Sequence, residues 1–248
     1  MRYEYIMQFF LQGTHPSWHP RLTHALGAMD SDYLLSLTQS NTWLPGMHHI
    51  LAAFSEPLAS TRYILFGESP YPRAESANGQ AFWDAAVGPI WRDTGFSKDV
   101  NRATSLRNIM KMLLHARGDL ESDFSQPAIA KLDHTRYHQT LDAFFTNMMR
   151  QGFLLLNASL VYEDKKIPYH AKHWAPFMEA LLDSFSCDSD SHQTNQIKLI
   201  LFGRVAEKIP GHTRFTSVLA EHPYNLSFIT NPDVMNFFKP MDLLLHDK

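Results

Sequence analysis

Four short apolar segments have the pattern of strands that are covered on both faces. Their apolar residues run on continuously instead of alternating with polar ones, and a glycine or a polar residue stands at or near the carboxyl end of each. Continuous apolarity is typical of strands in a parallel sheet. The pattern therefore predicts a parallel sheet built from 62–66 (RYILF), 152–160 (GFLLLNASL), 197–203 (IKLILFG) and 215–223 (FTSVLAEHP).

Helical periodicity fills the stretches between these segments. Apolar residues recur there at spacings of three and four, which predicts amphipathic helices with one face in the core. Ser105, or Thr104 before it, is the expected N-cap of the first helix, and Gly152 is expected to end the second. The polar segment 186–196 is expected to be a solvated loop. The predicted helices are 105–117 (SLRNIMKMLLHAR), 139–152 (QTLDAFFTNMMRQG) and 174–185 (WAPFMEALLDSF).

The alternation of strands with helices indicates a single α/β domain with a parallel sheet. Ligands of such sheets bind beyond the carboxyl ends of the strands, so the residues that follow each apolar segment are the first candidates for a site. These candidates are 67–72, 157–161, 203–205 and 222–227.

The composition narrows the class of protein without indicating an activity. Apolar residues make up 44% of the 248 residues and charged residues 19%, as in ordinary globular proteins. The net charge of −3 does not suggest nucleic acid as a ligand, but it does not exclude it, because only the charge around a groove matters. A single cysteine, Cys187, excludes an internal disulfide and favours a cytoplasmic setting.

The N-terminal segment 1–16 has a short apolar patch that Glu4 and Gln8 interrupt. The patch is too short and too broken for a signal sequence or a membrane span. We therefore expect a packed helix or arm there, and no association with a membrane.

The sequence GESPYP, which follows the first strand, raises the question of a serine nucleophile at Ser69. A strand followed by GES resembles the G-x-S-x-G elbow of α/β-hydrolases, and Asp183 and His222 follow in the order of their triad. However, the elbow needs a small residue where Tyr71 stands. Its oxyanion hole also uses the backbone N–H of the residue after the nucleophile, and here that residue is Pro70, which has none. These two objections disfavour the nucleophile hypothesis.

Several motifs, in order along residues 18–245, resemble those of the uracil-DNA glycosylase family. WLPGMHHILAAF (43–54) resembles the lead-in Y-P-x-x-x-x-I-F-x-A-F, and GESPYP…ANGQAF resembles the water-activating G-Q-D-P-Y-H…G-x-A-F. TSLRNIMKML resembles P-S-L-x-N-I-x-K-E-L, and GFLLLNASLVY resembles G-V-L-L-L-N-x-x-L-T-V. IPYHAKHWAPF resembles S-H…G-W-x-x-F, and IKLILFGRVAEK resembles the family's strand with G-S-x-A-Q-K. HPYNLS resembles H-P-S-P-L-S. Phe238 follows His222 at the spacing of the family's H-F-S segment.

The resemblance implies the family's fold, a three-layer α/β/α arrangement with a central four-stranded parallel sheet. We therefore expect one domain of this kind over residues 1–248, with residues 1–50 as an N-terminal helical lead-in. This expectation agrees with the strands and helices that the apolar pattern predicts.

The resemblance also implies how a base would be recognised after it leaves the DNA stack. Phe82 matches the phenylalanine that stacks on uracil, and Asn157 matches the asparagine whose amide reads the uracil edge. Tyr71 matches the tyrosine that occupies the space of a thymine methyl group. His170 matches a histidine beside the active site.

Further matches imply roles in bond cleavage and in DNA binding. His222 matches the histidine that donates a hydrogen bond to uracil O2 as charge develops on the leaving base. Leu226 matches the leucine that enters the duplex where the nucleotide leaves, which offsets part of the unstacking cost. The expected contacts to DNA phosphates are Ser105, Gly203, Arg204 and Ser227.

The chain departs from the family pattern at its catalytic aspartate, where Ser69 stands. A neutral serine cannot stabilise the positive charge of the sugar, so Glu68 and Asp84 are the candidate substitutes. Asp84 follows Phe82 as an aspartate does in another branch of the superfamily. The glutamate also resembles the G-E-A-P motif of the iron–sulfur branch, but that cluster needs four cysteines and this chain has one.

We expect no cofactor and no metal. His134 and His138 have the i, i+4 spacing of a helical metal site, but Thr135 stands where the H-E-x-x-H motif has its glutamate.

The resemblance therefore implies a monomeric protein that excises uracil or a related damaged base from single- or double-stranded DNA by hydrolysis of the N-glycosidic bond. Its activity is expected to be reduced because Ser69 replaces the aspartate. The alternative is a catalytically inactive family member that binds DNA or a uracil-like ligand.

Overall fold

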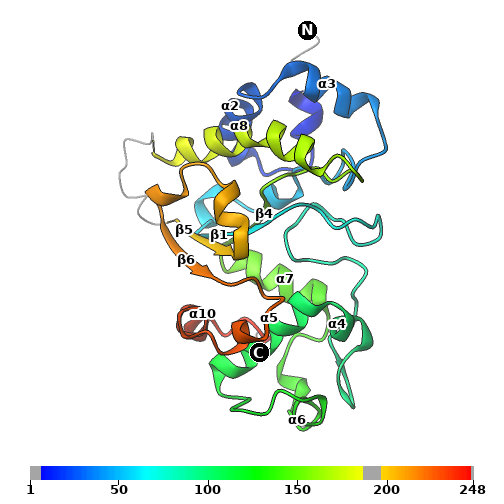
Figure 1. Cartoon of the computed structure of the whole chain (residues 1–248), viewed down its shortest axis with the longest axis vertical. Coiled ribbons are helices and arrows are strands. Elements are labelled where there is room, and N and C mark those ends of the chain that lie inside the picture. The colour runs from blue at the N-terminus through cyan, green and yellow to red at the C-terminus, as the bar shows by residue number, and fades with distance from the viewer. Residues whose placement is uncertain (1–6, 187–196, 247–248) are drawn as a thin grey trace.

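The computed structural model describes residues 7–186 and 197–246 (Figure 1). The predicted loop after residue 186, including Cys187, lies outside these ranges. Residues 7–10 are helical and Phe10 is buried, which agrees with the packed helix expected near the N-terminus. Within the described ranges, no helix combines the length and the apolar character that a membrane crossing requires.

The central sheet has four parallel strands in the order β4-β1-β5-β6. Three strands lie within a predicted segment and β1 extends one residue beyond its segment, so the predicted parallel α/β sheet is confirmed. Because parallel strands end at the same edge, the last residue of β1, Gly67, pairs with the last residue of β4, Asn157. The strands are β1 (Tyr63–Gly67), β4 (Phe153–Asn157), β5 (Lys198–Phe202) and β6 (Thr216–Ala220). A separate antiparallel pair consists of β2 (Trp91–Arg92) and β3 (Gly95–Phe96).

Helices connect the strands and cover the sheet. The α-helices are α2 (His19–Gly27), α3 (Ser31–Gln39), α4 (Lys98–Arg102), α5 (Thr104–Arg117), α6 (Gln126–Ala130), α7 (Leu141–Arg150), α8 (Ile167–Ser186) and α10 (Pro232–Phe238). The short 3-10 helices are η1 (Pro16–Trp18), η2 (Ala52–Ser55), η3 (Leu58–Ser60), η4 (His134–Arg136), η5 (Gly203–Lys208), η6 (His212–Arg214), η7 (Leu226–Thr230) and η8 (Lys239–Met241).

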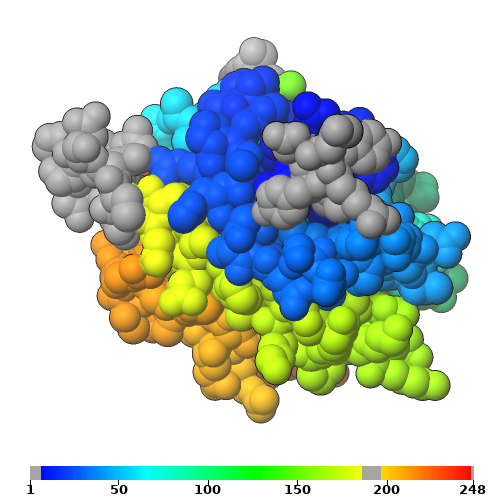
Figure 2. Space-filling view, turned by 90° about the horizontal axis from the view of Figure 1, so that it is seen from above, coloured from blue at the N-terminus to red at the C-terminus, as the bar shows by residue number. Residues whose placement is uncertain are grey.

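The sheet separates two hydrophobic clusters, because successive side chains of a strand point to opposite faces. Ile64 and Phe66 of β1 join the cluster that contains α2, α3 and α8, whereas Leu65 joins the cluster that contains α5, α7 and α10. Figure 1 shows these two groups of helices above and below the sheet. Figure 2, seen from above, shows α8 (yellow-green) beside the N-terminal helices (blue). The three-layer α/β/α arrangement is confirmed.

Three local expectations differ from the structure. The N-cap of α5 is Ala103, not Ser105 or Thr104, because α4 ends at Arg102 and leaves only one residue between the two helices. Helix α8 begins at Ile167, before the predicted start at 174. Strand β6 is only partly buried, whereas the other edge strand, β4, is buried throughout, and Leu219 is 56% exposed.

Candidate active site

A pocket of about 280 Å³ lies at the carboxyl edge of the sheet, and we call it the edge pocket. It brings together many of the residues that the sequence singles out, although they are far apart along the chain. The predicted site residues in its lining are Glu68, Ser69, Tyr71, Phe82, Ser105, Asn157 and His222. Gly67, Pro70, Pro72, Gln80 and Tyr162 complete the lining.

The amide of Asn157 lies in a closely packed position beside Gly67. Asn157 is the last residue of β4 and is 2% exposed. A Cβ atom added to Gly67 would lie 2.5 Å from Asn157 Oδ1 and 3.0 Å from the Cβ of Ala81. The absence of a side chain at Gly67 therefore leaves the space that this amide occupies. A primary amide both donates and accepts hydrogen bonds, so it can distinguish ligands by the order of their donors and acceptors.

Phe82 and Tyr71 form an aromatic wall of the edge pocket. Phe82 has a φ of 63°, a left-handed conformation that costs a non-glycine residue about 1 kcal/mol or more. The Tyr71 hydroxyl donates a hydrogen bond to the Phe82 carbonyl at 3.2 Å, and the Ala81 N–H donates one to Leu155 at 3.0 Å. These bonds hold the strained segment against the sheet. Burial raises the pKa of Tyr71, so its hydroxyl stays a neutral donor.

His222 lines the same pocket, with its ring centroid 6.4 Å from that of Phe82. Its Nδ1 accepts a hydrogen bond from the Tyr224 N–H at 3.1 Å, so the proton of the neutral ring lies on Nε2. Burial lowers the pKa of His222, although the charge of Glu68 opposes this effect. The edge pocket therefore contains a neutral imidazole that can donate from Nε2.

The loop of His222 is held by residues from two other elements. Asn108, fully buried in α5, donates from Nδ2 to the carbonyl of Pro223 at 2.8 Å and to that of Tyr224 at 3.4 Å. Gly203 has a φ of 66°, and a Cβ atom there would lie 2.8 Å from the Cβ of His222. The position of the imidazole thus depends on contacts from α5 and from the end of β5.

Glu68 is the only acidic residue in the described lining of the edge pocket. Its side chain is about half exposed, and its carboxylate forms an ion pair with Lys208 Nζ at 2.8 Å. Lys208 ends η5, so the pair connects the loop after β1 to the loop after β5. Ser69 lines the pocket next to Glu68 and adds no charge.

Asp84 does not line the edge pocket. Its buried carboxylate accepts hydrogen bonds from Arg73 and from the Ala86 N–H, both at 3.0 Å. It contributes instead to a neighbouring pocket of about 300 Å³, which Tyr71 also lines. The structure therefore separates Asp84 from Asn157 and His222, with Tyr71 between them.

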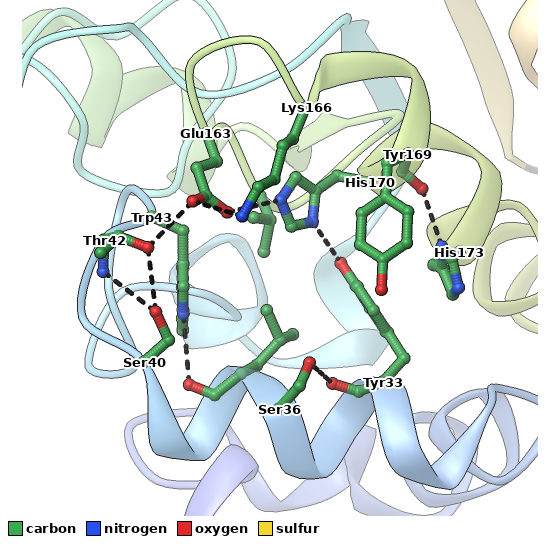
Figure 3. Close-up of polar contacts among 12 residues, drawn as sticks. Tyr33, Ser36, Ser40, Thr42, Trp43, Glu163, Lys166, Tyr169, His170 and His173 are labelled. Carbon is green, nitrogen blue, oxygen red and sulfur yellow. Dashed lines mark hydrogen bonds and ion pairs between the residues drawn. The ribbon is translucent and has the colours of Figure 1, made fainter.

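His170 also lies outside the described lining of the edge pocket. It is buried near the start of α8, where Nδ1 accepts a hydrogen bond from the Tyr33 hydroxyl at 2.8 Å and Nε2 donates to Glu163 at 3.2 Å (Figure 3). Burial lowers its pKa, which favours the neutral ring. The structure thus places it in a second pocket between α3 and α8, which we call the helix pocket.

The predicted DNA-binding residues lie around the edge pocket. Ser105, in the first turn of α5, lines it directly, and Gly203 packs against His222. Arg204 is exposed, 3.9 Å from Glu207. Leu226 and Ser227 begin η7, shortly after His222 in the chain, and Leu226 is 71% exposed.

Sequence reasoning gave no role to Gln80, Tyr162, Lys208 or Tyr224. All four stand inside motifs that match the family, so the motifs themselves held a signal. Tyr162 follows the buried strand β4, and a bridge to Leu44 brings the N-terminal lead-in to the edge pocket. No local pattern in the sequence indicates that pairing.

Comparisons with known proteins agree with this geometry, although no family model matches the chain. A crystal structure of the UNG from Nitratifractor salsuginis is 39% identical, with a TM-score of 0.89, and the match covers 99% of this chain and 98% of that one. The uracil-DNA glycosylase of Amoebophilus asiaticus is 29% identical over 199 residues, which are 78% of this chain and 74% of that protein. The mimivirus uracil-DNA glycosylase, 13% identical with a TM-score of 0.53 over 88% of this chain and 71% of that one, shares the fold.

Proposed function

The chain belongs to the uracil-DNA glycosylase superfamily, and from this premise we propose that it excises uracil from DNA by hydrolysing the N-glycosidic bond. The observation that carries the proposal is the meeting of Tyr71, Phe82, Asn157 and His222 in one pocket. Tyr71 and Phe82 lie in the connection after β1, Asn157 ends β4 and His222 follows β6, and together they supply a stacking ring, an amide and a neutral donor.

We propose that an extruded uracil stacks on Phe82 and pairs its polar edge with the amide of Asn157. Enzymes that act on a base take it out of the stack into such a pocket. The Tyr71 ring, held by its hydrogen bond to the Phe82 carbonyl, leaves no space for a 5-methyl group. This arrangement favours uracil over thymine, and the fixed amide disfavours cytosine.

His222 stabilises the leaving base in this mechanism. As the bond between C1′ and N1 breaks, its electron pair moves onto the uracil ring and negative charge develops at O2. The Nε2–H of the neutral imidazole donates a hydrogen bond to that oxygen, and Asn108 holds the loop in place. Preorganised donors of this kind are often the largest electrostatic contribution to a rate.

Glu68 is our candidate for the missing carboxylate. In this proposal water attacks C1′ and Glu68 accepts its proton, while the negative charge stabilises the sugar cation. The position of Glu68 in the lining of the edge pocket supports this role. Asp84 is the weaker candidate, because Arg73 and the Ala86 N–H hold its carboxylate on the other side of Tyr71.

DNA, single- or double-stranded, is the proposed partner. Leu226 is exposed enough to enter a duplex at the place of the extruded nucleotide. The proposed contacts to phosphates are Ser105, Gly203, Arg204 and Ser227. His170 keeps a proposed role beside the site through its hydrogen bond to Glu163, the neighbour of Tyr162.

We further propose that the described residues act as one domain and that the protein is a cytoplasmic monomer. The shared sheet, which separates the two hydrophobic clusters, supports the first statement. The single cysteine supports the cytoplasmic setting.

A second candidate function is binding of uracil-containing DNA without turnover. Ser69 in place of an aspartate favours it, as does the ion pair that engages Glu68 with Lys208. In this case the edge pocket retains the base and releases it unchanged.

A single-turnover assay on uracil-containing single- and double-stranded oligonucleotides separates the two functions. The wild type is expected to release uracil, Ser69→Asp to release it faster, and Glu68→Gln to release it more slowly. Asp84→Asn is expected to have the smaller effect of the two carboxylate variants. Binding of uracil DNA without product would support the second function, whereas neither product nor preference over a thymine control would refute both.

A further inference from the structure

The helix pocket has a volume of about 630 Å³, and none of its lining residues contacts the base or the sugar in the proposed reaction. It lies between α3 and the first turns of α8. In Figure 3, Trp43 and Tyr33 stand on opposite sides of the space, and His170 stands between them. Glu163, Lys166 and Tyr169 belong to the same lining as Trp43 and His170.

The Glu163 carboxylate and the His170 ring of the helix pocket are engaged by hydrogen bonds from neighbouring side chains. The Glu163 carboxylate accepts hydrogen bonds from Thr42 Oγ1 at 3.0 Å, Lys166 Nζ at 2.9 Å and His170 Nε2 at 3.2 Å. The other ring nitrogen of His170 accepts from the Tyr33 hydroxyl. The charged acceptor of this pocket is therefore already engaged by neighbouring donors, and so is the acceptor nitrogen of its imidazole.

The rim offers cationic donors and an aromatic surface instead. Lys165 is exposed, and within the described ranges no hydrogen bond or ion pair engages it. Lys166 still has two N–H donors beside the one that Glu163 accepts. Tyr169 is 48% exposed, and its ring is supported by that of His173, with centroids 4.2 Å apart. An unengaged cation, Lys165, next to an exposed aromatic ring favours a ligand that carries a phosphate and a planar base.

The helix pocket adjoins the edge pocket through one backbone bridge. The Leu44 N–H donates to the Tyr162 carbonyl at 2.8 Å, and the Tyr162 N–H donates to the Leu44 carbonyl at 2.9 Å. Tyr162 lines the edge pocket, whereas Glu163 and Trp43, the next residue on each side of the bridge, line the helix pocket. Ligands bound in the two pockets are therefore close neighbours.

We propose that the helix pocket binds another nucleotide of the DNA strand that delivers uracil to the edge pocket. The phosphate lies at Lys165 and Lys166, and the base stacks on Tyr169. This inference rests on the proposed function, because the strand in question is the one whose uracil enters the edge pocket. The subsite does not discriminate among bases, because stacking on a ring is tolerant of sequence. It takes an unpaired base, so it strengthens binding of single strands more than of duplexes.

Equilibrium binding of a single-stranded oligonucleotide of roughly 15 nucleotides that contains thymine and no uracil tests the subsite without any excision. Fluorescence anisotropy compares the wild type with Lys165→Ala, Tyr169→Ala and Lys172→Ala. Lys172, exposed on the same helix and outside the pocket lining, is the matched control. We expect the first two substitutions to raise Kd roughly five- to tenfold and the control less than about twofold.

Three further measurements exclude a merely structural effect. Lys165→Ala is expected to lower the slope of log Kd against log salt by about 0.7, the value for one phosphate on a single strand. Tyr169→Phe is expected to retain binding, because the ring remains. The Kd of free uracil, which occupies only the edge pocket, is expected to stay unchanged in every variant.

The results distinguish this subsite from the proposed function. If Lys165→Ala and Tyr169→Ala bind the oligonucleotide like Lys172→Ala, or if they weaken free uracil equally, the subsite is refuted even in an active enzyme. If the wild type releases no uracil but the two variants still lose oligonucleotide binding, the proposed activity fails and the subsite stands. A wild type that binds no oligonucleotide refutes both.

Discussion

Gly67→Ala is the sharpest test of base recognition by Asn157. The added methyl group would lie 2.5 Å from Asn157 Oδ1, whereas ordinary contact begins at 3.4 Å, so the two groups must separate by about 0.9 Å. The backbones of β1 and β4 are held in register by their pairing, which runs to Gly67 and Asn157 themselves. The amide must therefore turn or shift, and its donor and acceptor leave their positions.

The expected loss of activity follows from the size of that shift. A displacement of about 1 Å in a group that positions a substrate costs on the order of 100-fold in rate. This factor corresponds to about 2.7 kcal/mol of activation free energy. Overpacking of a buried site costs about 1–3 kcal/mol of stability, out of a total of roughly 5–15 kcal/mol. The variant is thus expected to remain folded, with a melting temperature lower by several degrees.

Single-turnover release of uracil and a melting curve, measured on the same preparations, check both expectations. Gly88→Ala is the matched control, since a Cβ atom at Gly88 meets nothing within 4 Å. It should retain both the rate and the melting temperature of the wild type. A folded Gly67→Ala protein that releases uracil at the wild-type rate would show that the amide of Asn157 does not read the base.

The remaining predictions concern the groups around the base. Burial lowers the pKa of His222 below its usual 6.5, so the excision rate should stay constant from neutral pH down to about 6.5 and fall only below that pH. An excision rate that already declines above pH 7 would contradict the neutral-imidazole mechanism. The same lowered pKa makes the free energy of unfolding decrease below pH 6.5, because His222 binds a proton more readily in the unfolded chain than in the folded protein. Melting curves measured across this pH range test this expectation. Asn108→Ala should cost about 1–3 kcal/mol in urea unfolding, because the carbonyls of Pro223 and Tyr224 lose their donor, and should slow excision as His222 loses its support. Leu226→Ala should slow excision from duplex DNA roughly tenfold and from single strands little, and equal losses on both substrates would argue against a wedge.

Local periodicity was sufficient to predict the layers of this fold. The four apolar segments became the four strands, and the stripes at 105–117 and 139–152 became the buried faces of α5 and α7. These features depend on residues that are close along the chain. The N-cap of α5 was mispredicted because it depends on α4, whose presence no apolar stripe indicated.

The candidate site also combines features that the sequence predicts with features that depend on tertiary contacts. Motif order identified Tyr71, Phe82, Asn157 and His222, and the structure brings all four to one pocket. The direction of a side chain relative to that pocket depends on distant partners, which the sequence does not display. A hydrogen bond from Arg73 holds the Asp84 carboxylate outside the edge pocket, and hydrogen bonds with Tyr33 and Glu163 hold His170 in the helix pocket.

The sequence by itself therefore determined which chemical groups stand at the carboxyl ends of the strands. It determined an amide, two aromatic rings and an imidazole, and it placed a serine where the family has its aspartate. Only the tertiary structure decided which of the two candidate carboxylates, Glu68 or Asp84, lines the edge pocket. Glu68 lines the edge pocket and pairs with Lys208 from another loop, whereas Asp84 lies beyond Tyr71. The physical reason is that charges interact according to their distance in space, and contacts between separate strands and loops set that distance.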